Sequence, residues 1–360
     1  MKYALIGCGR VAPSHIKAAI ENGLEIAAVC DLDASRMERL LENSGLSAEK
    51  IAAVRRFTDY TALFREVRPT LASIALPSGL HAACAFEGLK NDVNLIVEKP
   101  LAMSLADADE IIRLAKEHGV LVSACHQNRF NKAVQALRAA LEAGRFGRLS
   151  NAAITVRWDR DEAYYAQDAW RGTWENDGGT LMNQCIHGID LLCWMCGYEI
   201  ESVYGQIRRQ FHPYIQAEDL GTAVMTFKNG AVATVEGTVN VCGPDMEEHL
   251  TLLGEHGAVK LGGTSANTIE HWYFDDDPND QKDGFHEPTR NVYGNGHTSL
   301  FADMAQAIRD GGQPYVTAED GRRALEAVLA IYLSAKHGAP VKLPLPADAA
   351  GTNLEGFFDA

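Results

Sequence analysis

The chain has 360 residues, of which 46% are hydrophobic and 22% are charged, and this composition excludes disorder as its main state. Its net charge of −15 argues against nucleic acid as a partner, because phosphate binding requires surplus lysine and arginine. No apolar run approaches the roughly 18–20 residues of a membrane span, and Met1 leads directly into a strand. We therefore expect a cytoplasmic protein without membrane contact.

The first third of the chain alternates short apolar strands with helices. Strands are predicted at residues 3–6, 25–30, 71–76, 94–97 and 120–125. Helices are predicted between them, from Pro13 to near Gly23 and at residues 36–41, 79–89 and 104–118. This alternation predicts an α/β fold with a doubly wound parallel sheet, which we assign to residues 1–122.

The pattern changes after about residue 145, where period-two alternation begins at Ile154, Val156 and Trp158. Predicted strand pairs at residues 222–227 with 231–241, and at 250–253 with 259–261, flank short turns. Consecutive hairpins predict a mainly antiparallel sheet in a second, α+β domain, residues 123–360. Helices at 297–309 and 318–336 are expected to close this domain, and the acidic segment 275–283 is expected to be a solvated loop.

A glycine motif follows the first predicted strand. Its residues Gly7, Cys8, Gly9, Arg10, Val11 and Ala12 read G-x-G-x-x-A. The first glycine permits a tight turn, the second allows a pyrophosphate to approach the backbone, and Ala12 allows close helix packing. Asp31 ends the second strand, where it can accept hydrogen bonds from an adenosine ribose. Because Asp31 would repel a ribose phosphate, the sequence predicts NAD rather than NADP.

Two further positions carry side chains suited to proton transfer. Lys99 follows the strand at 94–97, at the strand end where open α/β sheets place ligands, although a lone lysine there is also typical of a solvated loop. Asn183 and His187 are four residues apart on one predicted helical face. A single histidine in that setting can equally be a hydrogen-bonded core residue.

Several motifs together resemble the glucose–fructose oxidoreductase, inositol dehydrogenase and rhizopine-catabolism family (Gfo/Idh/MocA). They are the glycine motif, Asp31, Pro77-Ser78-Gly79-Leu80-His81, Glu98-Lys99-Pro100 and the helix with Asn183 and His187. The resemblance covers essentially the whole chain. It implies an N-terminal Rossmann domain and an open, mainly antiparallel C-terminal sheet that pairs between subunits, as a homodimer or homotetramer.

Other segments resemble one group of this family, the UDP-N-acetylglucosaminuronate 3-dehydrogenases of the WlbA/WbpB type. They are Gln127-Asn128-Arg129, Tyr164-Tyr165, Trp170-Arg171-Gly172-Thr173-Trp174, Asp177-Gly178-Gly179, Met182-Asn183-Gln184 and Tyr293-Gly294-Asn295-Gly296-His297. This resemblance implies NAD-dependent oxidation at carbon three of UDP-2-acetamido-2-deoxy-D-glucuronate, in the synthesis of diamino sugars for surface polysaccharide such as lipopolysaccharide.

The resemblance also implies roles for individual residues. His187 is the expected base for the hydroxyl proton, and Lys99 either shares that role or steadies the developing alkoxide. Many family members carry Asp at the position of Asn183, so here Asn183 is expected to orient substrate. Asp190 either orients His187 or belongs to a local hydrogen-bond network. The expected substrate-binding residues are Lys99, Arg129, Tyr164, Tyr165, Arg171, Asn183, His187 and Tyr293.

The expected cofactor-binding residues, besides the glycine motif and Asp31, are Pro77, His81, Glu98, Lys99, Gln127, Trp170 and Arg171. An ordinary salt bridge or a core aromatic is the alternative for the arginines, tyrosines and tryptophan. No metal is predicted, because His286 and His297 with segment 275–283 lack regular ligand spacing.

Three other functions stay open from the sequence. The chain could oxidise a free sugar or inositol, regulate as a non-catalytic NAD-binding protein, or use NAD transiently to cleave glycosides. The sequence also leaves open whether NADH is released or is reoxidised in place by 2-oxoglutarate.

Overall fold

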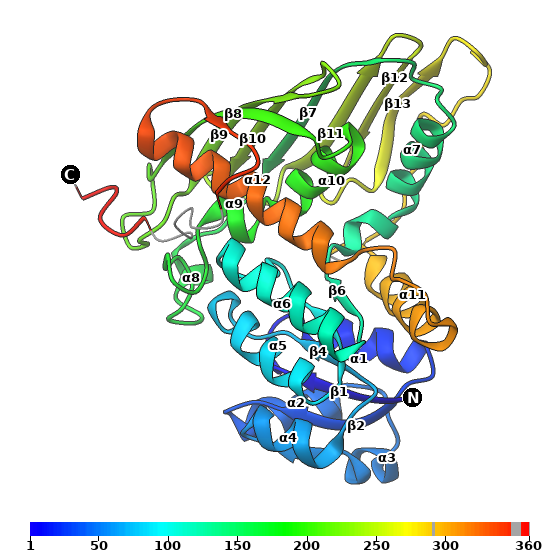
Figure 1. Cartoon of the computed structure of the whole chain (residues 1–360), viewed down its shortest axis with the longest axis vertical. Helices are drawn as coiled ribbons and strands as arrows, with labels where there is room; N and C mark the ends of the chain where they lie inside the picture. Colours follow the sequence, from blue (N-terminus) through cyan, green and yellow to red (C-terminus); the bar gives the residue numbers. More distant parts are fainter. Residues whose placement is uncertain (290–291, 347–353, 360) are drawn as a thin grey trace. The chain divides into compact units, whose positions relative to one another are not determined.

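The structure is a computed structural model that describes residues 1–289, 292–346 and 354–359. The chain divides into two compact units (Figure 1). Residues 1–126 and 297–322 form the first, called the N-terminal unit. Residues 127–296 and 323–360 form the second, called the C-terminal unit. The predicted assignment of residues 123–360 to one domain therefore differs from the structure, because the chain returns to the N-terminal unit at residue 297.

The N-terminal unit contains a six-stranded sheet in the order β3-β2-β1-β4-β5-β6, and every neighbouring pair is parallel. The strands are β1 (Lys2–Ile6), β2 (Glu25–Cys30), β3 (Arg55–Phe57), β4 (Leu71–Ile74), β5 (Asn94–Val97) and β6 (Val122–Ala124). Strands β1, β4 and β5 are almost wholly buried, as expected when helices cover both faces. The predicted doubly wound parallel sheet is confirmed.

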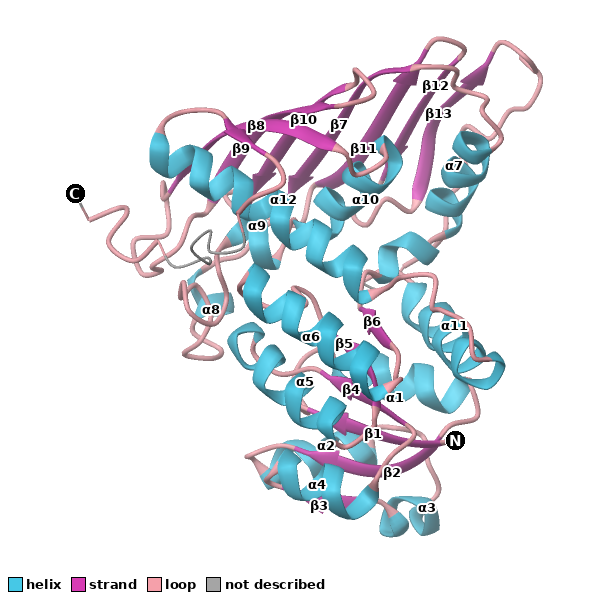
Figure 2. Ribbon diagram, viewed as in Figure 1, coloured by secondary structure: helices cyan, strands magenta, loops and turns pink. Residues whose placement is uncertain are grey.

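The helices of the N-terminal unit connect successive strands of this sheet, apart from the last, which the chain forms after strand β13 (Thr268–Phe274). They are α1 (Ala12–Glu21), α2 (Ala34–Glu42), α3 (Ala48–Ala53), α4 (Tyr60–Val67), α5 (His81–Lys90), α6 (Leu105–His118) and α11 (Gly296–Asp310), with a 3-10 turn η1 (Ser78–Leu80). Helices α4, α5 and α6 lie side by side (Figure 2). Helix α11 was predicted to close the second domain. It packs instead on α1 and β1, where Phe301 contacts His15 and Tyr3.

The C-terminal unit contains an eight-stranded sheet in the order β13-β12-β11-β7-β10-β9-β8-β14. Its strands are β7 (Leu149–Arg157), β8 (Ile200–Arg208), β9 (Leu220–Phe227), β10 (Val232–Thr238), β11 (Glu247–Gly254), β12 (Gly257–Gly262), β13 (Thr268–Phe274) and β14 (Val341–Lys342). All pairs are antiparallel except β7 with β10, which are parallel at the centre of the sheet. The predicted mainly antiparallel sheet is confirmed. The parallel pairing of β7 with β10 was not predicted.

Helices lie against one face of this sheet (Figure 2). They are α7 (Lys132–Glu142), α9 (Thr180–Asn183), α10 (Ile186–Cys196) and α12 (Ala318–His337); the short α8 (Glu162–Tyr165) and the 3-10 turn η2 (Gln127–Phe130) complete the unit. The contact is close, because a Cβ at Gly188 of α10 would lie 2.8 Å from Ile154 of β7. The opposite face has no helix among the described residues. None of the helices described is both long enough and apolar enough to span a membrane.

Candidate active site

The glycine motif forms a tight turn between β1 and α1. Gly7 has a φ of +94°, and a Cβ there would lie 2.3 Å from the carbonyl oxygen of Ala75, so only glycine fits. A Cβ on Gly9 would meet no atom within 4 Å, which leaves open space beside the backbone where a pyrophosphate is expected. No side chain caps α1 at Val11, so the helix N-terminus is not occupied from within the chain. The turn therefore fits a dinucleotide.

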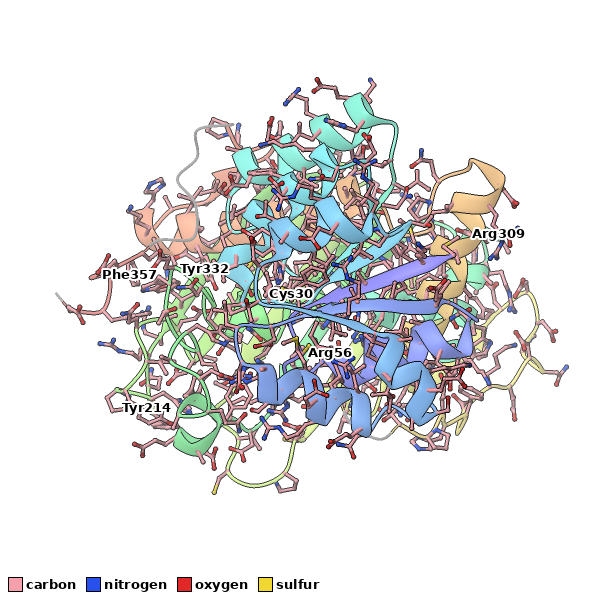
Figure 3. The ribbon with its side chains drawn as sticks, turned by 90° about the horizontal axis from the view of Figure 1, so that it is seen from below. Cys30, Arg56, Tyr214, Arg309, Tyr332 and Phe357 are labelled. Atoms are coloured by element: carbon pink, nitrogen blue, oxygen red, sulfur yellow. The ribbon has the colours of Figure 1, made fainter. Side chains whose placement is uncertain are left out.

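Asp31 lies beside this turn, directly after Cys30, which is labelled in Figure 3. Its Oδ2 accepts a hydrogen bond from the backbone N–H of Cys8 at 2.8 Å, and its Oδ1 accepts from that of Asp33 at 2.9 Å. Each carboxylate oxygen has a further lone pair, so these bonds orient the group without exhausting it. Arg10 lies exposed on the same turn.

Lys99 lies after β5, where the chain turns through a cis Lys99–Pro100 peptide bond. His81 supports this turn from α5: its Nδ1 lies 2.7 Å from the Pro100 carbonyl oxygen, and its Nε2 lies 2.9 Å from the Leu76 carbonyl oxygen. Burial lowers the pKa of His81. Pro77 precedes η1 in the same loop. The predicted residues Pro77, His81, Glu98 and Lys99 are thus brought together in the N-terminal unit.

Glu98 has partners that the sequence did not reveal. Its Oε1 lies 2.8 Å from Nε2 of His15 and 3.8 Å from Nε2 of His297. Burial alone would raise the pKa of Glu98, but hydrogen bonds and charge from His15 and His297 outweigh it and hold the pKa well below the ordinary value. From the sequence, His297 was named in the motif at residues 293–297 and with segment 275–283, but not as a partner of Glu98. Its position beside Glu98 follows from α11 joining the N-terminal unit.

Asn183 and His187 lie in the C-terminal unit on two short helices rather than on one, since the chain breaks between α9 and α10 at Gln184 and Cys185. Both side chains are buried. The amide nitrogen of Asn183 donates to Asp177 Oδ1, and its oxygen accepts from Gln184 Nε2 at 2.7 Å. Asp177 was recognised only as part of a motif. Its contact with Asn183 makes it a further site residue.

Arg171 lies in an aromatic cluster next to this pair. Its Nη1 donates to the Tyr164 hydroxyl at 2.7 Å, and its guanidinium lies 4.5 Å from the Tyr164 ring and 4.7 Å from the Trp170 ring. The same hydroxyl accepts from Gln184 Nε2 at 2.9 Å, which links Arg171 to Asn183. Arg171 Nε is buried without a hydrogen-bond partner, 3.8 Å from Asp168. A buried guanidinium with a spare donor is suited to an anion.

Tyr165, Gln127 and Tyr293 are further predicted site residues, and all three lie in the C-terminal unit. Tyr165 is buried, with its ring against those of Tyr164 and Tyr214. Gln127 donates to the carbonyl oxygen of Tyr293 at 3.2 Å, so these two are brought together.

Arg129 is completely buried and forms a bidentate ion pair with Asp190. Its position does not support the expected contact with a substrate anion, because Asp190 already neutralises its charge in the core. Asp190 accordingly belongs to a local network, one of the two roles left open for it.

A doubly wound sheet with a glycine turn and a carboxylate after its second strand, followed by a domain with buried Asn and His, defines a dinucleotide-dependent oxidoreductase. Comparison with family models agrees. Residues 1–126 match the NAD-binding Rossmann fold of the Gfo/Idh/MocA oxidoreductase family, and residues 138–343 match its C-terminal alpha/beta domain. The chain belongs to this family, as its motifs suggested, and is an NAD-dependent dehydrogenase.

Two similar solved structures are WlbA dehydrogenases, each in complex with NADH and UDP-GlcNAcA. The one from Bordetella pertussis is 31% identical, with a TM-score of 0.83 over 96% of this chain and 99% of that one. The one from Chromobacterium violaceum is 31% identical, with a TM-score of 0.84 over 96% of each chain. Among curated proteins, the myo-inositol 2-dehydrogenase of Thermotoga maritima is 24% identical over 95% of this chain and 98% of its own length.

Proposed function

We propose that this dehydrogenase oxidises the hydroxyl at carbon three of UDP-2-acetamido-2-deoxy-D-glucuronate, in the synthesis of surface polysaccharide. The observation that carries the proposal is the 31% identity, over 96% of the chain, to two WlbA dehydrogenases in complex with NADH and UDP-GlcNAcA. Arg171 adds support, because this substrate carries a pyrophosphate and a carboxylate and Arg171 has a spare buried donor.

The reaction removes a hydride and a proton from one secondary alcohol and leaves a ketone. NAD, when bound, supplies the hydride acceptor. We assign the proton to His187, whose ordinary pKa near neutrality suits a base, with Lys99 as the donor that stabilises the developing alkoxide. Asn183 is held by Asp177 and Gln184, so its amide is oriented in advance to position the sugar.

The proposal is tested by following NADH formation with purified protein and UDP-2-acetamido-2-deoxy-D-glucuronate. UDP-N-acetylglucosamine, which lacks the carboxylate, and myo-inositol are the comparison substrates. We expect the uronate to have the highest kcat/KM, and Arg171→Gln to raise its KM. Undetectable affinity for UDP in a calorimetric titration would refute the proposal. Loss of turnover in Lys99→Ala and in His187→Ala would exclude a non-catalytic NAD-binding regulator.

A second candidate is the oxidation of a free polyol, which the similarity to the myo-inositol 2-dehydrogenase favours. In that case inositol, and not the UDP-sugar, would support NADH formation. A further assay compares turnover with and without added 2-oxoglutarate. If product forms without net NADH only when 2-oxoglutarate is present, NADH is reoxidised in place. Product formed by glycoside cleavage would show no net NADH under either condition.

We also propose that the open face of the eight-stranded sheet pairs with a second copy of the chain in the cytoplasm. Tyr204, Val224 and Val232 are between 41% and 44% exposed, although their neighbours in sequence alternate toward the helix-covered face. Exposed apolar side chains on a sheet face are typical of subunit contacts. Light scattering should show a dimer or tetramer that Val224→Lys dissociates, whereas Phe211→Ser, in an exposed loop, should not.

A further inference from the structure

Three buried side chains surround the carboxylate of Glu98, and no step of the proposed reaction uses them. His15 comes from α1, His297 from α11 and Cys125 from the end of β6. Their ligand-type atoms and those of Glu98 lie within 4.8 Å of one another. All four belong to the N-terminal unit, so this cluster does not depend on the second unit.

The hydrogen bonds of the cluster converge on one acceptor group. His15 Nε2 lies 2.8 Å from Glu98 Oε1, and because a carboxylate can only accept, the imidazole donates this hydrogen bond. The Cys125 Sγ lies within 4.8 Å of the Glu98 carboxylate. The His15 and His297 rings meet edge to face, with centroids 5.4 Å apart. Hydrogen bonds from several donors offset the free-energy cost of burying a carboxylate.

The same carboxylate reaches the backbone of the predicted catalytic lysine. The N–H of Lys99 donates to Glu98 Oε2 at 3.3 Å. Glu98 therefore connects three parts of the unit: helix α1, whose N-terminus lies at the glycine turn; helix α11; and the chain at Lys99.

We propose that Glu98, held between His15 and His297, is a positioning residue that fixes the backbone at Lys99 relative to the dinucleotide-binding helix. This inference rests on the proposed role of Lys99. The hydrogen bond from His15 restrains one oxygen of the carboxylate, and His297 Nε2 lies 3.8 Å from the same oxygen. The other oxygen accepts from the backbone amide of Lys99. A misplacement of about 1 Å at a catalytic group can cost roughly 100-fold in rate.

Bound metal is the competing explanation for two histidines, a carboxylate and a cysteine in one place. The direct contact of 2.8 Å between His15 and Glu98 is a hydrogen-bond distance that needs no ion. Burial also raises the pKa of the Cys125 thiol well above its ordinary value, which disfavours the thiolate that a metal requires. Elemental analysis of the purified protein separates the two explanations, since one equivalent of zinc would overturn the positioning role.

The kinetic test is a double-mutant cycle with Glu98→Gln, His15→Gln and both together. Each single variant should lower kcat by about 10- to 100-fold and leave the KM for NAD near the wild-type value. The double variant should be no slower than Glu98→Gln, because both act through one contact. The matched control is His118→Gln, which removes a histidine–carboxylate pair with Asp92 at 2.9 Å on the surface of the same unit. Independent, multiplying losses would overturn the proposal.

Hydrogen exchange gives a readout that needs no substrate. In Glu98→Gln the amide of Lys99 should exchange faster than in wild type, while the amides of β5 keep their protection. If no candidate sugar is oxidised by the wild-type protein, the proposed function fails, yet this exchange result still tests the positioning role. Unchanged exchange at Lys99 would refute it. If Glu98→Gln does not fold, His15→Gln carries the same comparison.

Discussion

Arg129 and Asp190 form a bidentate ion pair in the core of the C-terminal unit. Arg129 Nε lies 2.7 Å from Asp190 Oδ2 and Nη2 lies 2.5 Å from Oδ1, and each side chain is 1% exposed. The guanidinium also lies 4.8 Å from the Trp194 ring. This pair joins η2, at the start of the unit, to α10, which carries His187.

Removing one charge of this pair should destabilise the protein without a specific effect on UDP binding. Asp190→Asn leaves the Arg129 charge buried and uncompensated, at an expected cost of about 3–5 kcal/mol in the free energy of unfolding. Glu142→Gln, which breaks the exposed pair with Arg138 on α7, should cost less than about 1 kcal/mol. Urea unfolding measures both. Equal losses in the two variants would contradict the burial argument.

Alanine substitutions at two glycines with the same backbone conformation should separate the cost of backbone strain from the cost of steric crowding. Gly179 and Gly197 both have a φ of +92°, so alanine is strained at either position by about 1–2 kcal/mol. At Gly179 the new Cβ would also lie 1.7 Å from Glu218 Oε2, whereas at Gly197 no atom lies within 4 Å. We expect Gly179→Ala to lower the thermal midpoint well beyond Gly197→Ala and to reduce kcat, because α9 and Asn183 follow directly. Similar midpoints would show that Glu218 can move aside.

Two buried carboxyls predict a stability that falls as pH rises. Burial raises the pKa of Glu218 and of Glu248 from 4.5 to about 8. Between those values the folded protein holds protons that the unfolded chain has released, so raising the pH favours unfolding. The stabilisation is complete below about pH 4.5 and is lost progressively up to about pH 8. Thermal midpoints across this range should fall for wild type.

The matching variant is Glu248→Gln, whose side chain is neutral at every pH. Its thermal midpoint should fall less than that of wild type over the same range, because only Glu218 still titrates. Glu199→Gln, at an exposed side chain, should follow the wild-type curve. A Glu248→Gln curve parallel to that of wild type would mean that Glu248 is ionised in the folded protein.

Alanine substitutions at the two glycines of the turn should separate an effect on folding from an effect on cofactor binding. Gly7→Ala should destabilise the N-terminal unit, since its Cβ would lie 2.3 Å from the Ala75 carbonyl oxygen. Gly9→Ala meets no protein atom and should keep the wild-type thermal midpoint, yet it should weaken NADH binding by filling the space beside the backbone. Fluorescence titration with NADH measures the second effect. Unchanged NADH affinity in Gly9→Ala would place the pyrophosphate elsewhere.

Local patterns predicted most of the N-terminal sheet, because its central strands are continuous apolar runs between glycine turns. β3 escaped prediction: Arg55-Arg56-Phe57 is short, lies at the sheet edge and contains no apolar run. β8 and β13 also escaped prediction, because no hairpin was recognised that joins either strand to its partner. The parallel pairing of β7 with β10 depends on tertiary packing, which hairpin signals do not encode.

The candidate site was predicted unevenly for the same reason. Gly7, Asp31 and Lys99 follow strands directly, so their positions follow from local sequence. The partners of Glu98 are separated from it by 83 residues for His15 and still more for His297, and no spacing rule joins them. For Arg129 the sequence predicted a substrate contact that its ion pair with Asp190 does not support. An arginine in a matching motif gives no sign of whether a carboxylate already neutralises it.

The return of the chain to the N-terminal unit at residues 297–322 has a consequence for its synthesis. A ribosome releases the six strands of the parallel sheet early, yet Phe301, which covers Tyr3 and His15, emerges only after strands β7 to β13 of the second sheet. The unit that is started first is therefore completed only after residues 127–296 have been made. A fragment that ends at residue 126 should expose an apolar surface on α1 and β1 and aggregate, even though it contains every strand of its sheet.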